Sequence, residues 1–144
     1  MSIFTCTIPG TPQQQGSKRN VGKVSIEANK NLAPWRADAI YALRWAMEKQ
    51  QVEQFTGAVV VFATFTYKRP SSHYGSGKNA SVLKATAPYF KCTAPDLDKL
   101  QRALGDALTQ SAVIRDDCLI VKWSPLKVWG EIPGTEVIVE NASG

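Results

Sequence analysis

Several kinds of residue on which small proteins often depend are scarce in this sequence. Its 144 residues include only three cysteines and a single histidine, His73. The cysteines are far apart and form no CxxC pair, which argues against a disulfide framework. One histidine is also too few to complete a zinc knuckle with them. We therefore expect Cys6, Cys92 and Cys118 to be buried thiols.

Long apolar runs are absent as well. No segment approaches the length of a membrane span, and the N-terminus lacks the charged-then-apolar layout of a signal peptide. The hydrophobic fraction of 44% and the charged fraction of 20% are typical of a globular protein. We expect one cytoplasmic domain that spans residues 1–144 and has no contact with a membrane.

Charge is unevenly distributed along the chain, whose net charge is +5. Residues 1–91 hold twelve basic and four acidic side chains, whereas residues 92–144 hold five and eight. Cations that hold phosphates and carboxylates that hold a metal are the two requirements of a metal-dependent nuclease. Many small proteins are basic without binding nucleic acid, so charge alone leaves the function open.

Hydrophobic periodicity predicts an α+β fold: a single mixed α/β domain with a sheet of about four strands and two main helices. Strand patterns cover residues 3–8, 24–26, 57–67, 118–121 and 135–140, and helical patterns cover residues 31–51 and 96–109. We expect the nearly apolar strand at 57–67 to be central and covered on both faces. Pro125 indicates that the strand beginning at residue 118 is kinked or lies on a sheet edge.

Two basic segments lack any core pattern. Residues 9–23 form an arm rich in proline and glycine, which could contact phosphates or simply be solvated. Residues 68–95 form a loop of a length that is usually functional or disordered in a compact domain. Its cations are interleaved with Tyr74, Tyr89 and Phe90, which suits DNA contact by charge and stacking. These cations are Lys68, Arg69, Lys78, Lys84 and Lys91. The candidate DNA-binding residues of the two segments are Lys18, Arg19, Lys23, Lys68, Arg69 and Lys78.

Five aspartates within residues 96–117 suggest a site for a hard divalent cation. Asp96 and Asp98 stand one residue apart where the loop meets the second helix, and Asp116 and Asp117 precede a strand. Three or four carboxylates with little else describe a Mg²⁺ site that keeps waters for a substrate phosphate. Such a metal activates a water and stabilises the departing oxygen.

Three further residues of the second helix bear on this candidate site. Lys99 and Arg102 are positioned to hold a scissile phosphate and to stabilise the charge of the transition state. Gly105 lies inside the helix, where glycine costs about 1 kcal/mol relative to alanine. That cost indicates close packing of the helix against another element or another subunit.

Each carboxylate also has a purely structural explanation. Asp96, which follows Pro95, could cap the helix, and acids in a first turn interact favourably with the helix dipole. Asp116 and Asp117 could form a turn before the strand. Asp106 could be an ordinary surface charge. Spacing alone therefore gives only a modest preference for a metal site.

The run that begins at Pro95, PDLDKLQRALGDALTQSAVIRDDCLIV, resembles the signature of the RusA family of Holliday junction resolvases. These are endonucleases of bacteria and their phages. The parts of the signature that match, with their separations kept, are Asp96-Leu97-Asp98, Arg102, Asp106-Ala107-Leu108 and Asp116-Asp117. The Ile-Pro-Gly turn that follows the first strand of the family also matches, at residues 8–10.

The resemblance implies a RusA-like homodimer that cuts four-way and other branched DNA by paired nicks, in a bacterial cell or a phage-infected host. It implies that Asp96, Asp98 and Asp117 bind a divalent metal, Mg²⁺ with Mn²⁺ as an alternative, and that Asp116 lies beside them. Arg102 stands where the family has a catalytically important lysine. Arginine and lysine are not interchangeable donors, so we expect phosphate stabilisation rather than proton donation from Arg102.

Lys99 also departs from the family pattern, because it replaces an asparagine. Two functions of other classes stay open beside the nuclease. One is a non-catalytic protein that binds branched DNA and whose carboxylates are structural. The other is a metal-dependent transferase that holds a nucleotide-sugar diphosphate. The short chain and the lack of a glycine-rich turn after a strand argue against the transferase.

Overall fold

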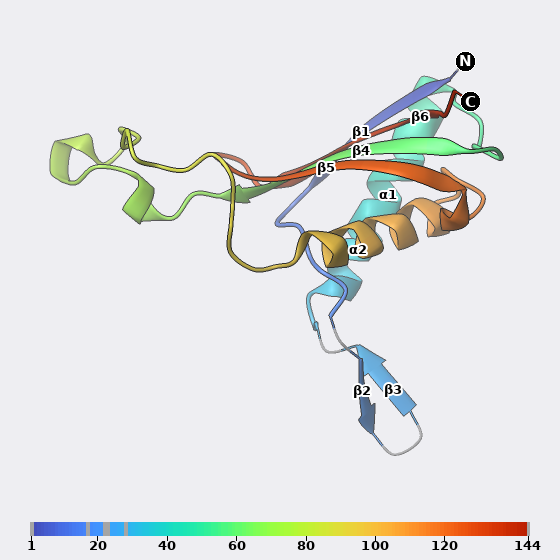
Figure 1. The fold of residues 1–144 in the computed structure, drawn as a ribbon, viewed down its shortest axis with the longest axis horizontal. Coiled ribbons are helices and arrows are strands. Elements are labelled where there is room, and N and C mark those ends of the chain that lie inside the picture. The colour runs from blue at the N-terminus through green and yellow to red at the C-terminus, as the bar shows by residue number, and fades with distance from the viewer. Residues whose placement is uncertain (1, 17, 22–23, 28, 144) are drawn as a thin grey trace.

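The computed structural model describes residues 2–16, 18–21, 24–27 and 29–143, with the backbone alone described for 18–21 and 24–27. Two helices and a four-stranded sheet form the body of the molecule, and a separate two-stranded hairpin and a long loop extend from it (Figure 1). The strands are β1 (Ile3–Pro9), β2 (Lys18–Val21), β3 (Val24–Glu27), β4 (Val59–Lys68), β5 (Ile120–Gly130) and β6 (Gly134–Asn141), and the helices are α1 (Leu32–Gln50) and α2 (Leu97–Gln110). These elements confirm the predicted α+β fold.

The sheet has the strand order β1-β6-β4-β5. Only the β4–β5 pair is parallel, and β1–β6 and β4–β6 are antiparallel. Parallel neighbours need a long crossover, and α2 lies in the segment that joins β4 to β5. Because β5 is the terminal strand of this sheet, the prediction from Pro125 that this strand is kinked or lies on a sheet edge is confirmed in its second part.

Both helices cover the same face of the sheet. Along β4 the odd-numbered residues from Val59 to Tyr67 are buried, and the even-numbered residues from Val60 to Thr66 are only half-buried. The buried residues of β1, β4 and β6 form one core cluster with those of α1 and α2. The prediction that both faces of β4 are covered is therefore wrong. Val60 and Phe62 favour a strand by shape, and this preference does not reveal where the helices lie.

Each helix buries one face against the sheet and exposes its opposite face to solvent. The buried residues of α2 are Leu100, Ala103, Leu104, Gly105, Ala107 and Leu108, and those of α1 are Leu32, Trp35, Ala39, Leu43 and Ala46. Arg36 on α1 forms an ion pair with Asp106 on α2, with 3.5 Å between the charged atoms. Within the described residues, no helix is long and apolar enough to cross a membrane.

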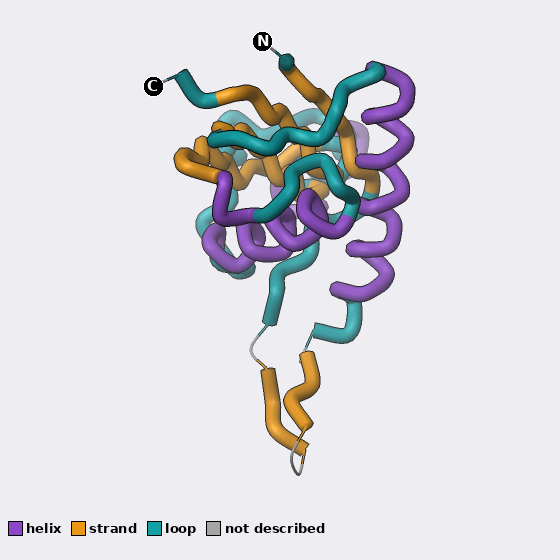
Figure 2. Tube along the Cα trace, turned by 90° about the vertical axis from the view of Figure 1, so that its right-hand side faces the viewer, coloured by secondary structure: helices purple, strands orange, loops and turns teal. Residues whose placement is uncertain are grey.

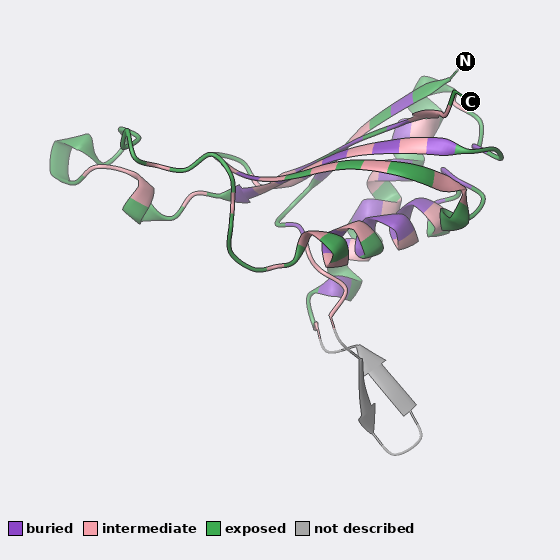
Figure 3. Cartoon of the chain, in the orientation of Figure 1, coloured by how far each residue is buried: buried purple, intermediate pink, exposed green. Residues whose placement is uncertain are grey.

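The loop between β4 and α2 extends away from the body of the molecule and returns along β5 (Figure 1). It contains two short 3-10 helices, η1 (Ser71–His73) and η2 (Gly77–Asn79), and most of its residues are exposed (Figure 3). The N–H of Trp129 donates to the Tyr89 carbonyl at 2.9 Å, and the N–H of Lys91 donates to the Lys127 carbonyl at 3.0 Å. The end of the loop therefore runs along the outer edge of β5 just before α2 begins.

The hairpin of β2 and β3 projects away from the sheet beyond the start of α1 (Figures 1 and 2). Its register pairs Lys18 with Glu27, which confirms the short strand predicted at residues 24–26. The side chains of Lys18 and Arg19 lie outside what the structure describes, as does the whole of Lys23. Their predicted contact with DNA stays a prediction.

The cysteines differ from the expectation of buried thiols. Cys92 and Cys118 are exposed, and Cys6 is half-buried between β1 and α1. Burial raises the pKa of the Cys6 thiol to about 11. The expectation is wrong for Cys92 and Cys118 because both lie in exposed segments next to α2 and β5, which periodicity does not place.

The one-sided burial of β4 predicts different costs for the same substitution at adjacent positions. We expect Val61→Thr to lower the free energy of unfolding by about 1–3 kcal/mol, because a hydroxyl would enter the core without a partner. We expect Val60→Thr, on the uncovered face, to change it by about 0.5 kcal/mol or less. Urea unfolding measures both, and equal costs would show that the second face is covered too.

Candidate active site

A solvent-open hollow of about 240 Å³ lies between α2, β5 and the 3-10 helix η3 (Asp117–Leu119). It brings together two of the predicted metal ligands, Asp98 and Asp117, and the predicted phosphate-binding residue Arg102. The complete lining is Asp98, Gln101, Arg102, Gly105, Asp117, Ile120 and Trp123. The hollow therefore brings together side chains from separate parts of the sequence. Their charges are those that a phosphodiester reaction requires.

The geometry of α2 explains why this hollow forms. Asp98 and Arg102 are four residues apart, so their side chains lie on the same face of the helix in successive turns. The next turn presents Gly105, where an added Cβ would lie 3.8 Å from the Cβ of Asp117 and 3.8 Å from Cζ2 of Trp123. Gly105 faces η3 and β5, but at these distances a Cβ would make only ordinary van der Waals contact, so the prediction that this glycine marks close packing is not confirmed.

The two adjacent aspartates before β5 have different environments. The carboxylate of Asp116 accepts a hydrogen bond from the N–H of Cys118 at 3.0 Å and so caps η3. That bond holds the pKa of Asp116 below its usual value. The pKa of Asp117 is raised, first by its partial burial and then by its contact with Asp116 and by the negative charges of Asp116 and Asp106. A cation beside Asp117 would offset this negative potential.

Asp96 lies just outside the hollow. It precedes α2 in extended backbone, and its carbonyl accepts the N–H groups of Lys99 and Leu100 at 3.2 Å. Its side chain makes no capping hydrogen bond, and the carboxylate lies 3.9 Å from the ammonium group of Lys99. The side-chain cap that was the structural explanation of Asp96 is therefore not observed, and Lys99 pairs with Asp96 instead of facing the hollow.

The four proposed ligands do not converge on one point in the single chain. Within the described ranges, no three His, Cys, Asp or Glu side chains are close enough to hold a metal together. Asp98 and Asp117 face the hollow, Asp116 caps η3 and Asp96 is paired with Lys99. Two carboxylates at an open hollow still fit a hydrated Mg²⁺, which often takes only one or two carboxylates besides waters and substrate phosphates.

Two lysines fix the backbone that leads into Asp96. The ammonium group of Lys127 donates to the carbonyls of Thr93 and Pro95 at 2.7 and 2.6 Å. That of Lys91 donates to the hydroxyl of Thr93 and to the Ala94 carbonyl, both at 2.6 Å. Burial and then the charge of Lys127 lower the pKa of Lys91. Sequence reasoning assigned Lys91 to DNA contact and missed Lys127, because carbonyl partners leave no pattern in a sequence.

The predicted DNA-binding residues of the loop also differ from one another. Lys68 at the end of β4 and Lys78 in η2 are exposed. Arg69 instead donates to the Pro88 carbonyl at 2.7 Å and contacts Nδ1 of His73 at 3.3 Å, so it joins the two ends of the loop. The exposed lysines are the better placed of the three to contact a phosphate backbone.

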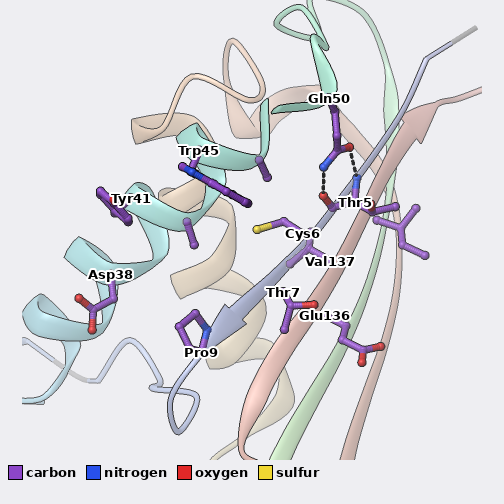
Figure 4. Close-up of a pocket in the computed structure, with 13 residues that line it drawn as sticks. Thr5, Cys6, Thr7, Pro9, Asp38, Tyr41, Trp45, Gln50, Glu136 and Val137 are labelled. Carbon is purple, nitrogen blue, oxygen red and sulfur yellow. Dashed lines mark hydrogen bonds between the residues drawn. The ribbon is translucent and has the colours of Figure 1, made fainter. Parts of the chain in front are cut away.

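A second hollow, larger than the one beside α2, has another character. It is a groove of about 930 Å³ between α1 and β1, and it is bordered by the exposed aromatic side chains of Tyr41 and Trp45 (Figure 4). Its lining carries two separated carboxylates, Asp38 and Glu136, and among the described residues no basic side chain. An apolar groove with negative charge does not suit a phosphodiester, so the smaller hollow beside α2 is the candidate active site.

Comparison with known families gives a match over most of the chain. The family model described as Endodeoxyribonuclease RusA matches residues 8–140, which include both helices and all residues that line the hollow beside α2. No curated protein matches the chain.

The contacts of Lys127 predict a local effect of its removal. We expect Lys127→Met to speed hydrogen exchange of the Lys99 and Leu100 amides about tenfold, because the turn at 93–95 loses hydrogen bonds from a charged group. Lys122→Met, on the exposed part of the same strand, is the matched control and should change neither amide. Exchange measured by NMR would contradict the assignment if both variants behaved alike.

Proposed function

The chain belongs to the RusA family of endodeoxyribonucleases, and we propose that it is a Mg²⁺-dependent nuclease that resolves four-way DNA junctions and other branched DNA by paired nicks. The observation that carries the proposal is that Asp98, Asp117 and Arg102 line one open hollow. Family membership supplies the reaction class, and this cluster supplies the place where the reaction can occur.

Asp98 and Asp117 are the proposed first ligands of the metal. Their oxygen donors suit Mg²⁺, and Mn²⁺ would bind the same groups. When bound, the metal would activate a water and stabilise charge on the phosphate and on the departing 3′ oxygen. Asp96 and Asp116 complete the proposed ligand set, and each would have to leave its present partner, Lys99 or the Cys118 amide.

Arg102 is the proposed phosphate-binding residue. Among the described residues it has no ion-pair partner, and it shares the hollow with both carboxylates. A guanidinium group presents paired N–H donors to two phosphate oxygens and keeps its charge at all working pH values. Arg102 therefore stabilises transition-state charge but does not donate a proton. Lys99 is proposed to contact the DNA strand at the rim.

The arm at residues 9–23 and the loop at residues 68–95 are both attached to the body of the protein near this hollow. The N–H of Gln15, at the base of the hairpin arm, donates to the Lys99 carbonyl at 3.2 Å, and the long loop ends directly before Asp96. Lys68 and Lys78 on the loop, and Lys18, Arg19 and Lys23 on the hairpin arm, are the proposed DNA contacts. DNA bound along either arm would be led toward the first turn of α2. Binding by so many cations should weaken steeply with added salt.

A homodimer is part of the proposal. A four-way junction has two-fold symmetry, so two copies related by a two-fold axis would present one active site to each of two opposed strands. Sedimentation in the absence and presence of junction DNA tests this point independently of cleavage. A monomer under both conditions at micromolar concentration would contradict it.

Removal of either proposed ligand should separate cleavage from binding. We expect Asp98→Asn and Asp117→Asn each to slow the cleavage of a fixed four-way junction in Mg²⁺ about 100-fold or more, because each amide replaces a charged ligand. Junction binding in EDTA should stay within about twofold of wild type. Asp38→Asn on α1 is the matched control and should cut normally.

The same assay distinguishes the alternative function. A protein that only binds branched DNA would bind equally well in Mg²⁺ and EDTA and would nick nothing. Full activity of Asp98→Asn would instead remove the site assignment and leave the nuclease class intact.

Substitutions of Arg102 test whether charge or proton transfer matters. We expect Arg102→Lys to retain cleavage within about tenfold of wild type and Arg102→Ala to lose about 100-fold, because the role needs a positive charge near the phosphate. Cleavage rates across pH 6–9 measure both variants. A new ionisation that appears in the pH profile of Arg102→Lys, with a large change in rate, would contradict a purely electrostatic role.

A further inference from the structure

Two aromatic side chains, Tyr89 and Phe90, stand side by side and exposed near the end of the long loop. Their exposed fractions are 57% and 55%. The rings are 5.0 Å apart between centroids and meet edge to face at 67°. An exposed pair of large rings is a feature that the catalytic hollow does not explain.

The backbone beneath this aromatic pair is fixed. Phe90 pairs with Val128 as a bridge of β-sheet type, and hydrogen bonds to Trp129 and Lys127 hold the residues on either side of it. The pair therefore sits on a loop segment that is bridged to the outer edge of β5. Rings on a fixed backbone lose little conformational freedom when a flat ligand stacks on them.

The other aromatic side chains of the loop already make contacts within the protein. The hydroxyl of Tyr74 donates to the carboxylate of Glu131. His73 packs edge-on against Trp129, with 5.0 Å between the ring centroids. Of the three aromatics to which the sequence assigned stacking, only Tyr89 and Phe90 keep exposed rings.

An exposed cation lies near the pair. Lys68 is at the end of β4, opposite Gly130 of β5. The ammonium group of Lys91, which follows the pair in the chain, is instead engaged with Thr93 and Ala94. Exposed aromatic rings near a cation suit single-stranded nucleic acid, because every base has a face that stacks and every nucleotide carries a phosphate.

We propose that Tyr89 and Phe90 form a base-stacking site that binds an unpaired base at the opened centre of a branched DNA. Trp123, in the catalytic hollow, and Val128, beneath the pair, are five residues apart on one strand, which corresponds to about 17 Å. That span is roughly five nucleotides of one DNA strand. The stacking site thus lies within reach of the strand that is cut.

This inference rests on the proposed function in one respect, because the substrate must be branched DNA. It adds the reason for the choice of substrate. Intact duplex offers no unpaired base, so a branched DNA can use the stacking site and its component duplexes cannot. Loss of a stacking ring should therefore weaken junction binding and leave duplex binding unchanged.

The test compares binding of a four-way junction and of its component duplex in EDTA, where no cleavage is required. We expect Tyr89→Ala and Phe90→Ala each to weaken junction binding about tenfold and duplex binding less than twofold. Phe90→Trp should retain junction binding. Tyr41→Ala, which removes an exposed ring from α1, is the matched control and should bind both DNAs as wild type does.

A second measurement locates the contact. With 5-iodouracil placed next to the strand exchange, we expect light-induced crosslinks to Tyr89 or Phe90, identified by mass spectrometry. Equal losses of junction and duplex binding, absence of these crosslinks, or a changed sedimentation of the DNA-free Phe90→Ala protein would each overturn the stacking site. The last result would assign the rings to a protein interface.

The outcomes also separate this inference from the proposed function. Selective loss of junction binding in the alanine variants, in a wild-type protein that never nicks DNA in Mg²⁺, would support the stacking site and overturn the nuclease. A wild-type protein that binds neither DNA would overturn both. Normal cleavage with unchanged junction selectivity in Phe90→Ala would overturn the stacking site alone.

Discussion

The position of η3 opposite Gly105 of α2 is the arrangement on which the candidate site depends. Gly105 leaves space there, because even an added Cβ would only reach ordinary van der Waals contact with Asp117 and Trp123. Asp98 and Arg102 occupy the preceding turns of the same face. A bulky side chain at position 105 would occupy the floor of the hollow and push η3 away. The position of η3 against α2 thus decides whether Asp98 and Asp117 can bind the same metal ion.

Some of the charged residues around this site have structural roles, and others face the hollow where the reaction is proposed. Asp106 ties α2 to α1 through Arg36, and Asp116 caps η3. Asp98 and Asp117 face the hollow without such a structural task, and desolvation, followed by the neighbouring carboxylates of Asp116 and Asp106, raises the pKa of Asp117. A net charge of +5 over the whole chain makes this local excess of carboxylates stand out. A cation and a phosphate would each find a complementary partner in the hollow.

The positions of the elements could be predicted from the sequence, and so could the stretch that holds the site. Helical and alternating periodicity located both helices and all four strands of the main sheet, because these patterns reflect burial directly. Periodicity did not show that both helices cover one face, so Val60 and Phe62 were expected to be buried on a second face. Periodicity also could not show that Asp116 caps η3 whereas Asp117 faces the hollow, because these roles depend on how η3 lies against α2.

Cations were the hardest residues to interpret. The sequence assigned Arg69 and Lys91 to DNA, whereas the structure pairs both with carbonyl groups of the loop. Lys127 was not considered, although it fixes the turn before Asp96. A lysine that binds its own backbone and one that awaits a phosphate look the same in a sequence. Tertiary contacts alone distinguish them.

The most direct test of the account is the location of a bound metal in crystals grown or soaked with Mn²⁺. We predict an anomalous difference peak in the hollow beside α2, within about 2.0–2.3 Å of carboxylate oxygens of both Asp98 and Asp117. A peak coordinated by other residues, or no peak in this hollow at a Mn²⁺ concentration that supports junction cleavage, would contradict it.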